Sequence, residues 1–99
     1  MIHAGNLHIE PDAHLVSIDD DPVDLTRMEF ALLYLLVSNP GRVFSRAYLV
    51  DTIWGVDYVG GDRSVDNTIL RLRKKLKTVG DCIEAVWGVG YRWARECHD

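Results

Sequence analysis

The chain has 99 residues, of which 47% are apolar, and its 11 Lys and Arg against 15 Asp and Glu give a formal charge of −4. This length fits a single domain over residues 1–99, with a modest core that needs no metal or disulfide support. No apolar run approaches the ~20 residues of a membrane-spanning helix. The N-terminus also lacks the basic and apolar regions of a signal peptide, so we expect a cytoplasmic protein without membrane contact.

Residues 5–25 contain short alternating apolar pieces, interrupted at Pro11 and again from Asp19 to Pro22. This pattern predicts a small antiparallel meander with one solvated face. Strand-like spacing could bring two of the histidines together, but surface or sheet positions are the preferred interpretation and we expect no metal site. The histidines are His3, His8, His14 and His98.

A first helix is predicted from Thr26, because Thr26 and Glu29 form a capping box and Leu25 and Phe30 occupy the positions of a hydrophobic staple. Its apolar run ends at Val37, before "SNPG".

A second helix is predicted from Ser45 to a break at Gly55, with Phe44 and Leu49 again placed as a staple. Residues 55–62 contain three glycines and no period, and they are typical of an exposed loop.

The third helix is predicted to open near Asp62 or Ser64 and to end at Gly80 as its C′ residue. After it, "CIEAV", a turn "WGVG" and "YRWA" indicate a β-hairpin. Cys82 and Cys97 are fifteen residues apart, and in a reducing compartment we expect free thiols or buried small side chains.

Positive charge is concentrated on the third helix. Residues 63–77 hold six of the eleven basic residues and a single acid, Asp66, so this segment is about +5 and the rest of the chain sums to −9. Because association is steered by the local field, this asymmetry says more about partners than the acidic total does.

The faces of this helix differ in chemistry. Its apolar positions form a core-facing stripe: Val65, Ile69, Leu72 and Leu76. Opposite the stripe lie Arg63, Asn67, Arg71 and Lys74, with Ser64 and Leu70 at the edges and Thr68, Arg73 and Lys75 on the flanks. In a major groove, Arg can form hydrogen bonds with guanine and Asn with adenine, whereas the basic side chains on the flanks are suited to phosphate contacts. An ordinary solvated helix face is the alternative.

The order of helix, helix, basic helix and hairpin is that of a winged helix. At this level the chain resembles the effector domain of OmpR/PhoB-family response regulators. The matching stretches are "LTRMEFALLYLLVSNPGRVFSRAYLVDTIWG", "DRSVDNTILRLRKKL" and "VWGVGYRW", from Leu25 to Trp93.

The resemblance implies an α+β fold: a winged helix-turn-helix with an N-terminal antiparallel sheet, three helices and a C-terminal β-hairpin wing. It implies base reading in the major groove by Arg63, Ser64, Asn67, Thr68, Leu70 and Arg71. Phosphate contacts are assigned to Ser45, Arg46, Trp54, Arg73, Lys74, Lys75 and Tyr91. The wing comprises Trp87, Gly88 and Val89, and is expected to reach the adjacent minor groove. A possible polymerase-contact loop comprises Gly55, Val56, Asp57, Tyr58, Val59, Gly60, Gly61 and Asp62.

Two positions depart from the family pattern. Leu70 stands where many members carry Arg, which could favour contact with a thymine methyl group. Trp87 replaces a wing Arg, so this wing could pack, stack or wedge instead of reading groove width by charge.

The resemblance implies a transcription factor that binds double-stranded DNA, usually direct repeats, as a tandem dimer without a cofactor. RNA polymerase is a possible partner, and a receiver domain and sensor kinase would belong to a longer protein, since no receiver is present here. One rival is a winged helix used mainly for protein contacts. An enzyme using Cys82 with a histidine, or a metal at Asp19 to Asp21, is disfavoured because neither set has the required spacing or charge.

Overall fold

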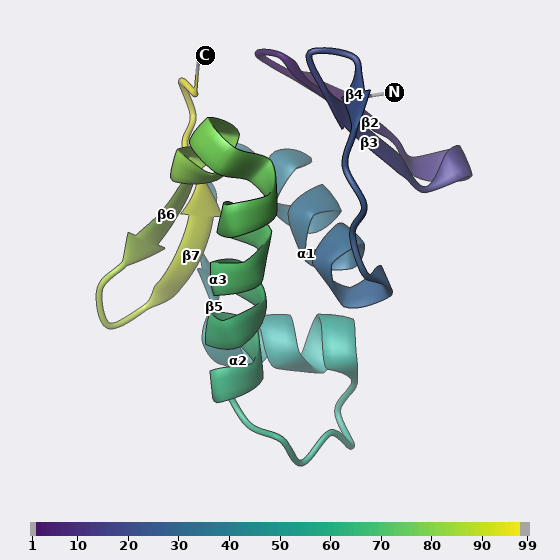
Figure 1. Ribbon diagram of the computed structural model, residues 1–99. Coiled ribbons are helices and arrows are strands. Elements are labelled where there is room, and N and C mark those ends of the chain that lie inside the picture. The colour runs from purple at the N-terminus through teal and green to yellow at the C-terminus, as the bar shows by residue number, and fades with distance from the viewer. Residues whose placement is uncertain (1, 98–99) are drawn as a thin grey trace.

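The structure is a computed structural model that describes residues 2–97, and it begins with a four-stranded antiparallel sheet (Figure 1). The strands are β1 (Ile2–Ala4), β2 (Leu7–Glu10), β3 (Leu15–Ile18) and β4 (Asp21–Pro22), in that spatial order, with a 3-10 turn, η1 (Pro11–Ala13), between β2 and β3. Leu7, Ile9 and Val16 alternate into the core. The predicted meander is confirmed, although β1 precedes it and is too short to show a period.

Helix α1 (Arg27–Val37) starts where predicted. Thr26 is its N-cap: the Thr26 hydroxyl accepts the Glu29 amide at 3.2 Å, and the Glu29 carboxylate accepts the Thr26 amide at 2.9 Å. The capping box is therefore confirmed. The helix contacts α3, η2 and β7, so it lies at the centre of the domain.

The second helical segment combines α2 (Arg46–Leu49) with a wider π-helical continuation, η2 (Val50–Trp54). Ser45 caps it by accepting the Tyr48 amide at 3.1 Å, as predicted. Gly55 ends it with φ of 109°, a backbone conformation that favours glycine.

Helix α3 (Arg63–Leu76) ends four residues before the predicted boundary. Lys77 breaks it with φ of 57°, and the chain continues as the 3-10 segment η3 (Lys77–Cys82). The assignment of Gly80 as the C′ residue was wrong. Gly80 instead permits close packing, because a Cβ there would lie 2.6 Å from the Arg73 carbonyl oxygen.

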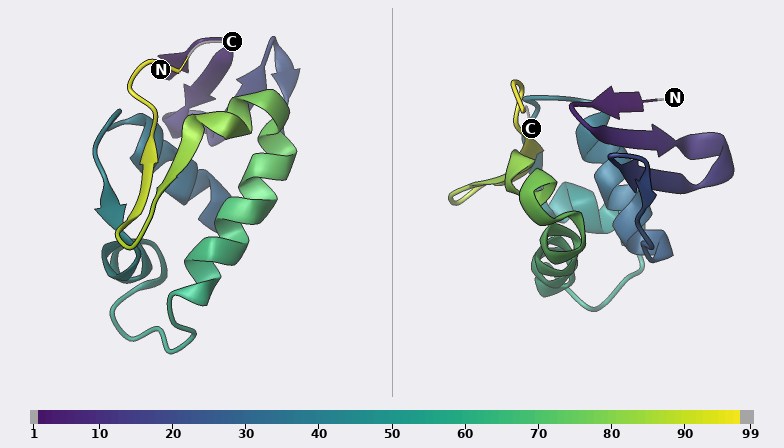
Figure 2. Two further views of the ribbon diagram at one scale, coloured as in Figure 1. Left: turned by 90° about the vertical axis from the view of Figure 1, so that its left-hand side faces the viewer. Right: turned by 45° about the horizontal axis from the view of Figure 1, so that its top comes forward.

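The predicted hairpin consists of β6 (Ile83–Val86) and β7 (Gly90–Trp93). A strand that sequence reasoning missed, β5 (Phe44–Ser45), pairs with β7, so the sheet order is β5-β7-β6. Figure 2 shows the hairpin projecting beside α3. A Cβ on Gly90 would collide with the Phe44 carbonyl oxygen, so this glycine permits the strands to approach.

Cys82 and Cys97 form a disulfide, with their Cα atoms 5.5 Å apart. The expectation of unpaired thiols was therefore wrong. Antiparallel pairing explains the juxtaposition: Ile83 lies opposite Trp93, and the Ala94 amide donates to the Cys82 carbonyl at 2.8 Å. The chain leaving β7 thus passes next to the residue that precedes β6.

Both sheets and all three α-helices contribute to one apolar core, which runs in sequence from Leu7 to Trp93. Within residues 2–97, every helix is too short or too polar to cross a membrane.

Candidate nucleic-acid interface

Helix α3 presents three chemically different faces. The inward face is buried and consists of Val65, Thr68, Ile69, Leu72 and Leu76. Thr68 therefore departs from the predicted flank position: it is almost fully buried and its hydroxyl donates to the Ser64 carbonyl at 2.7 Å. This placement does not support base reading by Thr68, since its only polar side-chain atom faces the helix itself.

The outward face carries Arg63, Asn67, Leu70 and Lys74, all exposed. Leu70 lies at the edge of this face, as expected from its spacing, and is 54% exposed. Arg71, expected in the middle, leans instead toward α1. Helical periodicity accounts for the position of Arg71, because the buried stripe extends to Thr68 on the same side of the helix.

A buried carboxylate on α1 engages the flank of α3 that faces it. Glu29 is 0% exposed, and its Oε1 accepts from Lys75 Nζ at 2.6 Å. Glu29 Oε2 lies 3.5 Å from Arg71 Nε, and Arg71 Nη2 donates to the Thr68 hydroxyl at 3.3 Å. Two side chains predicted to contact DNA are thus held against the body of the domain.

The charge state of Glu29 follows from competing effects. Burial disfavours the ionised form, but hydrogen bonds from Lys75 and from the Thr26 amide outweigh it and lower the pKa of Glu29. The carboxylate is therefore ionised at neutral pH and compensates the positive charge beside it. Sequence reasoning recognised Glu29 only as a capping residue, although a lone acid within an apolar run is a signal of such a partner.

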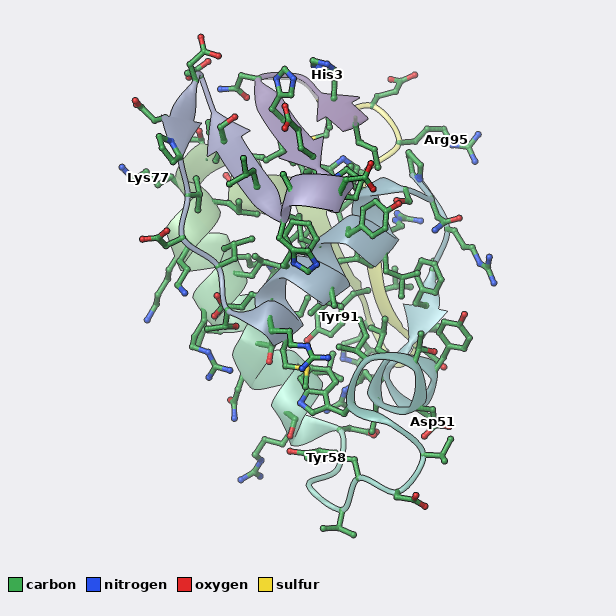
Figure 3. The ribbon with its side chains drawn as sticks, turned by 90° about the vertical axis from the view of Figure 1, so that its right-hand side faces the viewer. His3, Asp51, Tyr58, Lys77, Tyr91 and Arg95 are labelled. Atoms are coloured by element: carbon green, nitrogen blue, oxygen red, sulfur yellow. A yellow bond between two sulfur atoms is a disulfide. The ribbon has the colours of Figure 1, made fainter. Side chains whose placement is uncertain are left out.

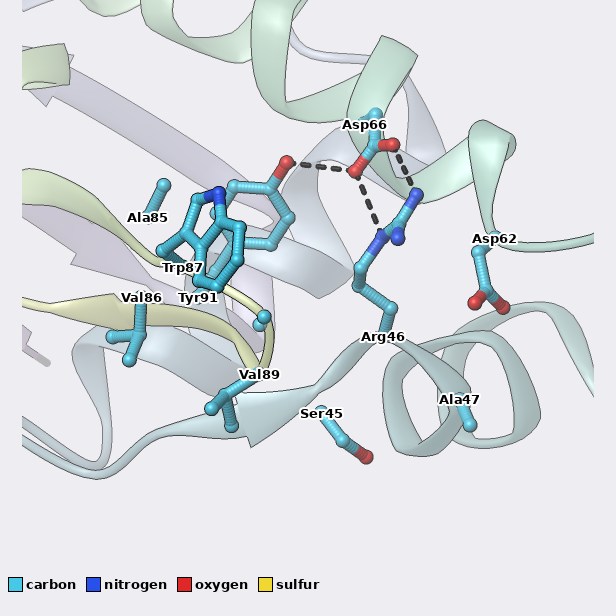
Figure 4. A pocket seen from close by; sticks show the side chains of 12 residues that line it. Ser45, Arg46, Ala47, Asp62, Asp66, Ala85, Val86, Trp87, Val89 and Tyr91 are labelled. Atoms are coloured by element: carbon cyan, nitrogen blue, oxygen red, sulfur yellow. Dashed lines mark hydrogen bonds and ion pairs between the residues drawn. The ribbon is translucent and has the colours of Figure 1, made fainter.

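The opposite flank of α3 is tied to α2 and the wing through Asp66. The Arg46 guanidinium donates to both carboxylate oxygens of Asp66, from Nε at 3.1 Å and from Nη2. The Tyr91 hydroxyl donates to Asp66 Oδ1 at 2.7 Å (Figure 4). This acid, the only one in α3, therefore neutralises Arg46 and joins three elements at one point.

Burial and the hydrogen bond to Asp66 raise the pKa of Tyr91 above its ordinary value. The phenol therefore remains protonated and continues to donate at physiological pH. Tyr91 and Trp93 are two residues apart on β7. Trp93 is buried, whereas Tyr91 is half-buried with its polar end reaching α3.

Arg73 also faces the wing strands. Its Nη2 donates to the Ile83 carbonyl at 2.6 Å, and its guanidinium carbon lies 6.0 Å from the centre of the Tyr91 ring. Arg73 thus fastens the base of the hairpin to α3, which leaves Arg63 and Lys74 as the basic side chains of the outward face.

The wing tip is apolar and exposed. Trp87 is 96% exposed and Val89 about half exposed. The Val89 amide donates to the Val86 carbonyl at 2.9 Å, and Gly88 supports this turn with φ of 76°. A cleft separates this hairpin from the first turns of α2 and α3, with Ser45, Arg46 and Asp66 among its lining residues.

The loop 55–62 is exposed at both of its valines, with Val59 at 98%. Tyr58 anchors it: its hydroxyl lies 2.6 Å from Ser64 Oγ, and its ring is 6.1 Å from that of the half-buried Trp54. Figure 3 shows Tyr58 at one end of the molecule, and Lys77 nearer the N-terminal sheet. Ser64, predicted to read a base, is therefore engaged with this loop.

The residues considered as catalytic or metal-binding groups have structural surroundings instead. Cys82 is in the disulfide, so it provides no thiolate. Asp19 and Asp20 lie in an exposed turn with positive φ, where Asp19 accepts from Asn6 at 2.9 Å. These positions support structural roles.

The sequence and the fold both match known proteins. The model of the family described as "Transcriptional regulatory protein, C terminal" matches residues 20–93. The transcriptional regulatory protein SrrA of Staphylococcus aureus is 38% identical over 103 aligned residues, which span all of this chain and 43% of SrrA. The chain thus covers less than half the length of that relative.

Solved structures of related domains have the same fold. The RstA DNA-binding domain of Klebsiella pneumoniae, in complex with the RstA box, aligns with a TM-score of 0.83 at 36% identity, over 95% of this chain and 96% of that one. The Thermotoga maritima response regulator DrrB, an OmpR/PhoB homologue, aligns with a TM-score of 0.84 at 30% identity, over 93% of this chain and 43% of DrrB. The fold, the family match and these relatives together show that the chain belongs to the OmpR/PhoB family of response-regulator effector domains, with the winged-helix fold of that family.

Proposed function

We propose that this domain binds double-stranded DNA with sequence preference and regulates transcription, with α3 inserted into the major groove. The observation that carries the proposal is the outward face of α3, where Arg63, Asn67 and Lys74 are exposed with Leu70 beside them. An α-helix fits the major groove, where Arg and Asn can each make a bidentate pair with one base. Leu70 would contact a thymine methyl group there.

The flanks of α3 orient this face. Arg46 and Tyr91, both bonded to Asp66, line or border the cleft beside the helix, where one sugar-phosphate backbone would run. Lys74 would add a phosphate contact from α3 itself. Arg71 and Lys75 reach DNA only by exchanging Glu29 for a phosphate or a base, so they contribute less than isolated cations would.

The proposal extends to the partners that the family implies. The domain would bind direct repeats as a tandem dimer, and a receiver domain controlled by a sensor kinase would raise the effective concentration of the second copy. It includes a cytoplasmic location, and it assigns the chain no catalytic step.

A second function, contact with protein, is favoured by the loop 55–62. Val56 and Val59 are both strongly exposed there, and apolar side chains of this kind mark interaction surfaces. RNA polymerase is the partner that the family resemblance implies. A domain that enriches no duplex at any salt concentration would favour this function over DNA binding.

The test is selection of bound duplexes from a random pool at moderate salt, with the wild type and single variants in parallel. The wild type should recover a defined site, and Asn67→Ala should lose the preference at one base pair, by about 1 to 3 kcal/mol. Arg95→Ala is the matched control, because Arg95 is an exposed basic residue at the end of the molecule opposite Tyr58 (Figure 3). It should recover the wild-type site.

Arg71→Ala separates the two roles of Arg71. Loss of one base preference would support base reading, whereas an unchanged site with lower stability would assign Arg71 to Glu29 alone. Identical sites from the wild type and Asn67→Ala would contradict the assignment of α3 as the reading helix.

A further inference from the structure

The tip of the wing is exposed and uncharged. Residues 85–91, "AVWGVGY", contain no charged side chain. Ala85, Trp87 and Val89 are exposed, and Trp87 leaves 96% of its surface in water. An exposed large aromatic among other apolar side chains marks a contact surface more often than it serves the fold.

The position of Trp87 is nevertheless defined relative to α3. Val86 pairs with Gly90 at the end of the hairpin, and the Val89 amide closes the turn on Val86. The hairpin is in turn attached to α3 at two points, through Tyr91 to Asp66 and through Arg73 to the Ile83 carbonyl. A ligand that receives α3 therefore meets Trp87 at a set distance from the helix.

The cleft between the hairpin and the helices indicates what lies beside Trp87. One wall carries Arg46 and Ser45, and the other is formed by the wing itself (Figure 4). When α3 occupies a major groove, the adjacent sugar-phosphate backbone runs past this cleft, whose lining holds Arg46 and Tyr91 together with the carboxylates of Asp62 and Asp66. Beyond that backbone lies the minor groove, which places Trp87 at its opening.

The chemistry of an indole limits what it can do there. Without a cation, the wing gains nothing from the negative potential of a narrow minor groove. Apolar side chains in the minor groove instead insert between base pairs, partly unstack them and kink the duplex. Pyrimidine–purine steps cost least to unstack, so such a wedge reads deformability.

We propose that Trp87 is an apolar wedge that enters the minor groove next to α3, unstacks one base step and selects a TA or CA/TG step at that position. This inference rests on the proposed DNA binding. It adds a specificity determinant at a site that α3 does not touch. A protein partner at the tip, such as a second copy on a direct repeat, is the competing outcome of the test.

The experiment uses the duplex recovered by selection, with 2-aminopurine placed in turn at each step flanking the α3 contact. Its fluorescence rises when a base is unstacked. Wild-type protein should raise it at one step, and replacing that step by AA should weaken binding about tenfold, as expected for one unfavourable base pair. Trp87→Ala should abolish the fluorescence rise and reduce the tenfold preference to near one.

Two further variants complete the design. Trp87→Phe retains a smaller aromatic ring and should keep part of both effects. Leu15→Ala removes an exposed apolar side chain from β3 of the N-terminal sheet and should behave as the wild type. Since Trp87 makes little contact with the fold, circular dichroism should be the same for all variants.

Binding by the wild type without unstacking at any step would overturn the wedge and leave the proposed function standing. A step preference that survives in Trp87→Ala would do the same. If Trp87→Ala lowered only the pairing of two domains on a direct repeat, the tip would be a protein contact. Failure of the wild type to bind any duplex would overturn DNA binding and the wedge together.

Discussion

Glu29→Gln is the substitution that tests most directly how α3 is attached to the body of the domain. The amide keeps the shape of the side chain and can still accept the Thr26 amide, so the capping box survives. What is lost is the negative charge that accepts from Lys75 at 2.6 Å and lies 3.5 Å from Arg71 Nε. The change therefore isolates the charged contact between α1 and α3.

The magnitude follows from the surroundings. A hydrogen bond to a charged group contributes about 1.5 to 3 kcal/mol, and removing one partner of a fully buried pair costs more. The side chains of Lys75 and Arg71 are partly exposed, so they can rotate to be hydrated by solvent once Glu29 is neutral. This favours a loss of stability in the middle of that range. We expect a loss of about 2 kcal/mol in the free energy of unfolding at pH 7.

The loss should depend on pH, with a sign that the pKa of Glu29 determines. Its pKa in the folded state lies below the ordinary value of 4.5. The stabilisation by Glu29 is therefore fully present above about pH 4.5 and disappears as the pH falls through the lower folded-state pKa. The difference between wild type and Glu29→Gln should accordingly shrink in acid.

Urea denaturation of the wild type and of Glu29→Gln, at pH 7 and at about pH 3, measures the difference in their free energies of unfolding. Glu84→Gln is the matched control, because Glu84 pairs with Arg92 at 2.8 Å at the surface, where such a pair contributes roughly 0 to 1 kcal/mol. An equal difference between wild type and Glu29→Gln at both pH values would refute the reasoning, as would a loss no larger than that of the control.

Three other changes test the remaining contacts. Lys74→Ala should weaken binding to all duplexes alike and reduce the slope of log K against log salt by about 0.9, and a loss confined to one base pair would contradict its phosphate role. Tyr91→Phe should lower stability by about 1 kcal/mol in thermal unfolding, because Asp66 loses a hydrogen bond, and an unchanged midpoint would argue against that bond. Reduction of the Cys82–Cys97 disulfide should lower the free energy of unfolding, measured by urea denaturation, by about 3 kcal/mol, the value expected for a closed loop of about fifteen residues. Wild-type behaviour in reductant would mean that the bond does not support the fold.

The buried charges change how the basic segment is interpreted. Counted along the chain, residues 63–77 are about +5. In the folded domain Lys75 and Arg71 face Glu29, and Asp66 is neutralised by Arg46. Glu29 subtracts one charge and Arg46 adds one, so the local sum stays at about +5. Two of the cations are held by Glu29, whereas Arg63 and Lys74 remain on the outward face of α3.

The elements of this fold could be predicted because their signals are local. The capping box joins Thr26 to Glu29, three residues further on, the cap at Ser45 contacts Tyr48, and Gly55 ends its helix by its own conformation. The basic helix was recognised in the same way, since helical periodicity separates the buried stripe from the charged face within fourteen residues.

The partners of individual side chains depend on contacts between distant parts of the chain. Glu29 is 46 residues from Lys75, and Asp66 is 20 from Arg46 and 25 from Tyr91. No period or spacing relates such pairs, because they meet only after α1, α2 and the hairpin have packed around α3. The same holds for the disulfide, which depends on the register of β6 and β7. The sequence thus sufficed to identify the basic helix and the family, whereas which cations remain available to a ligand was decided by tertiary packing.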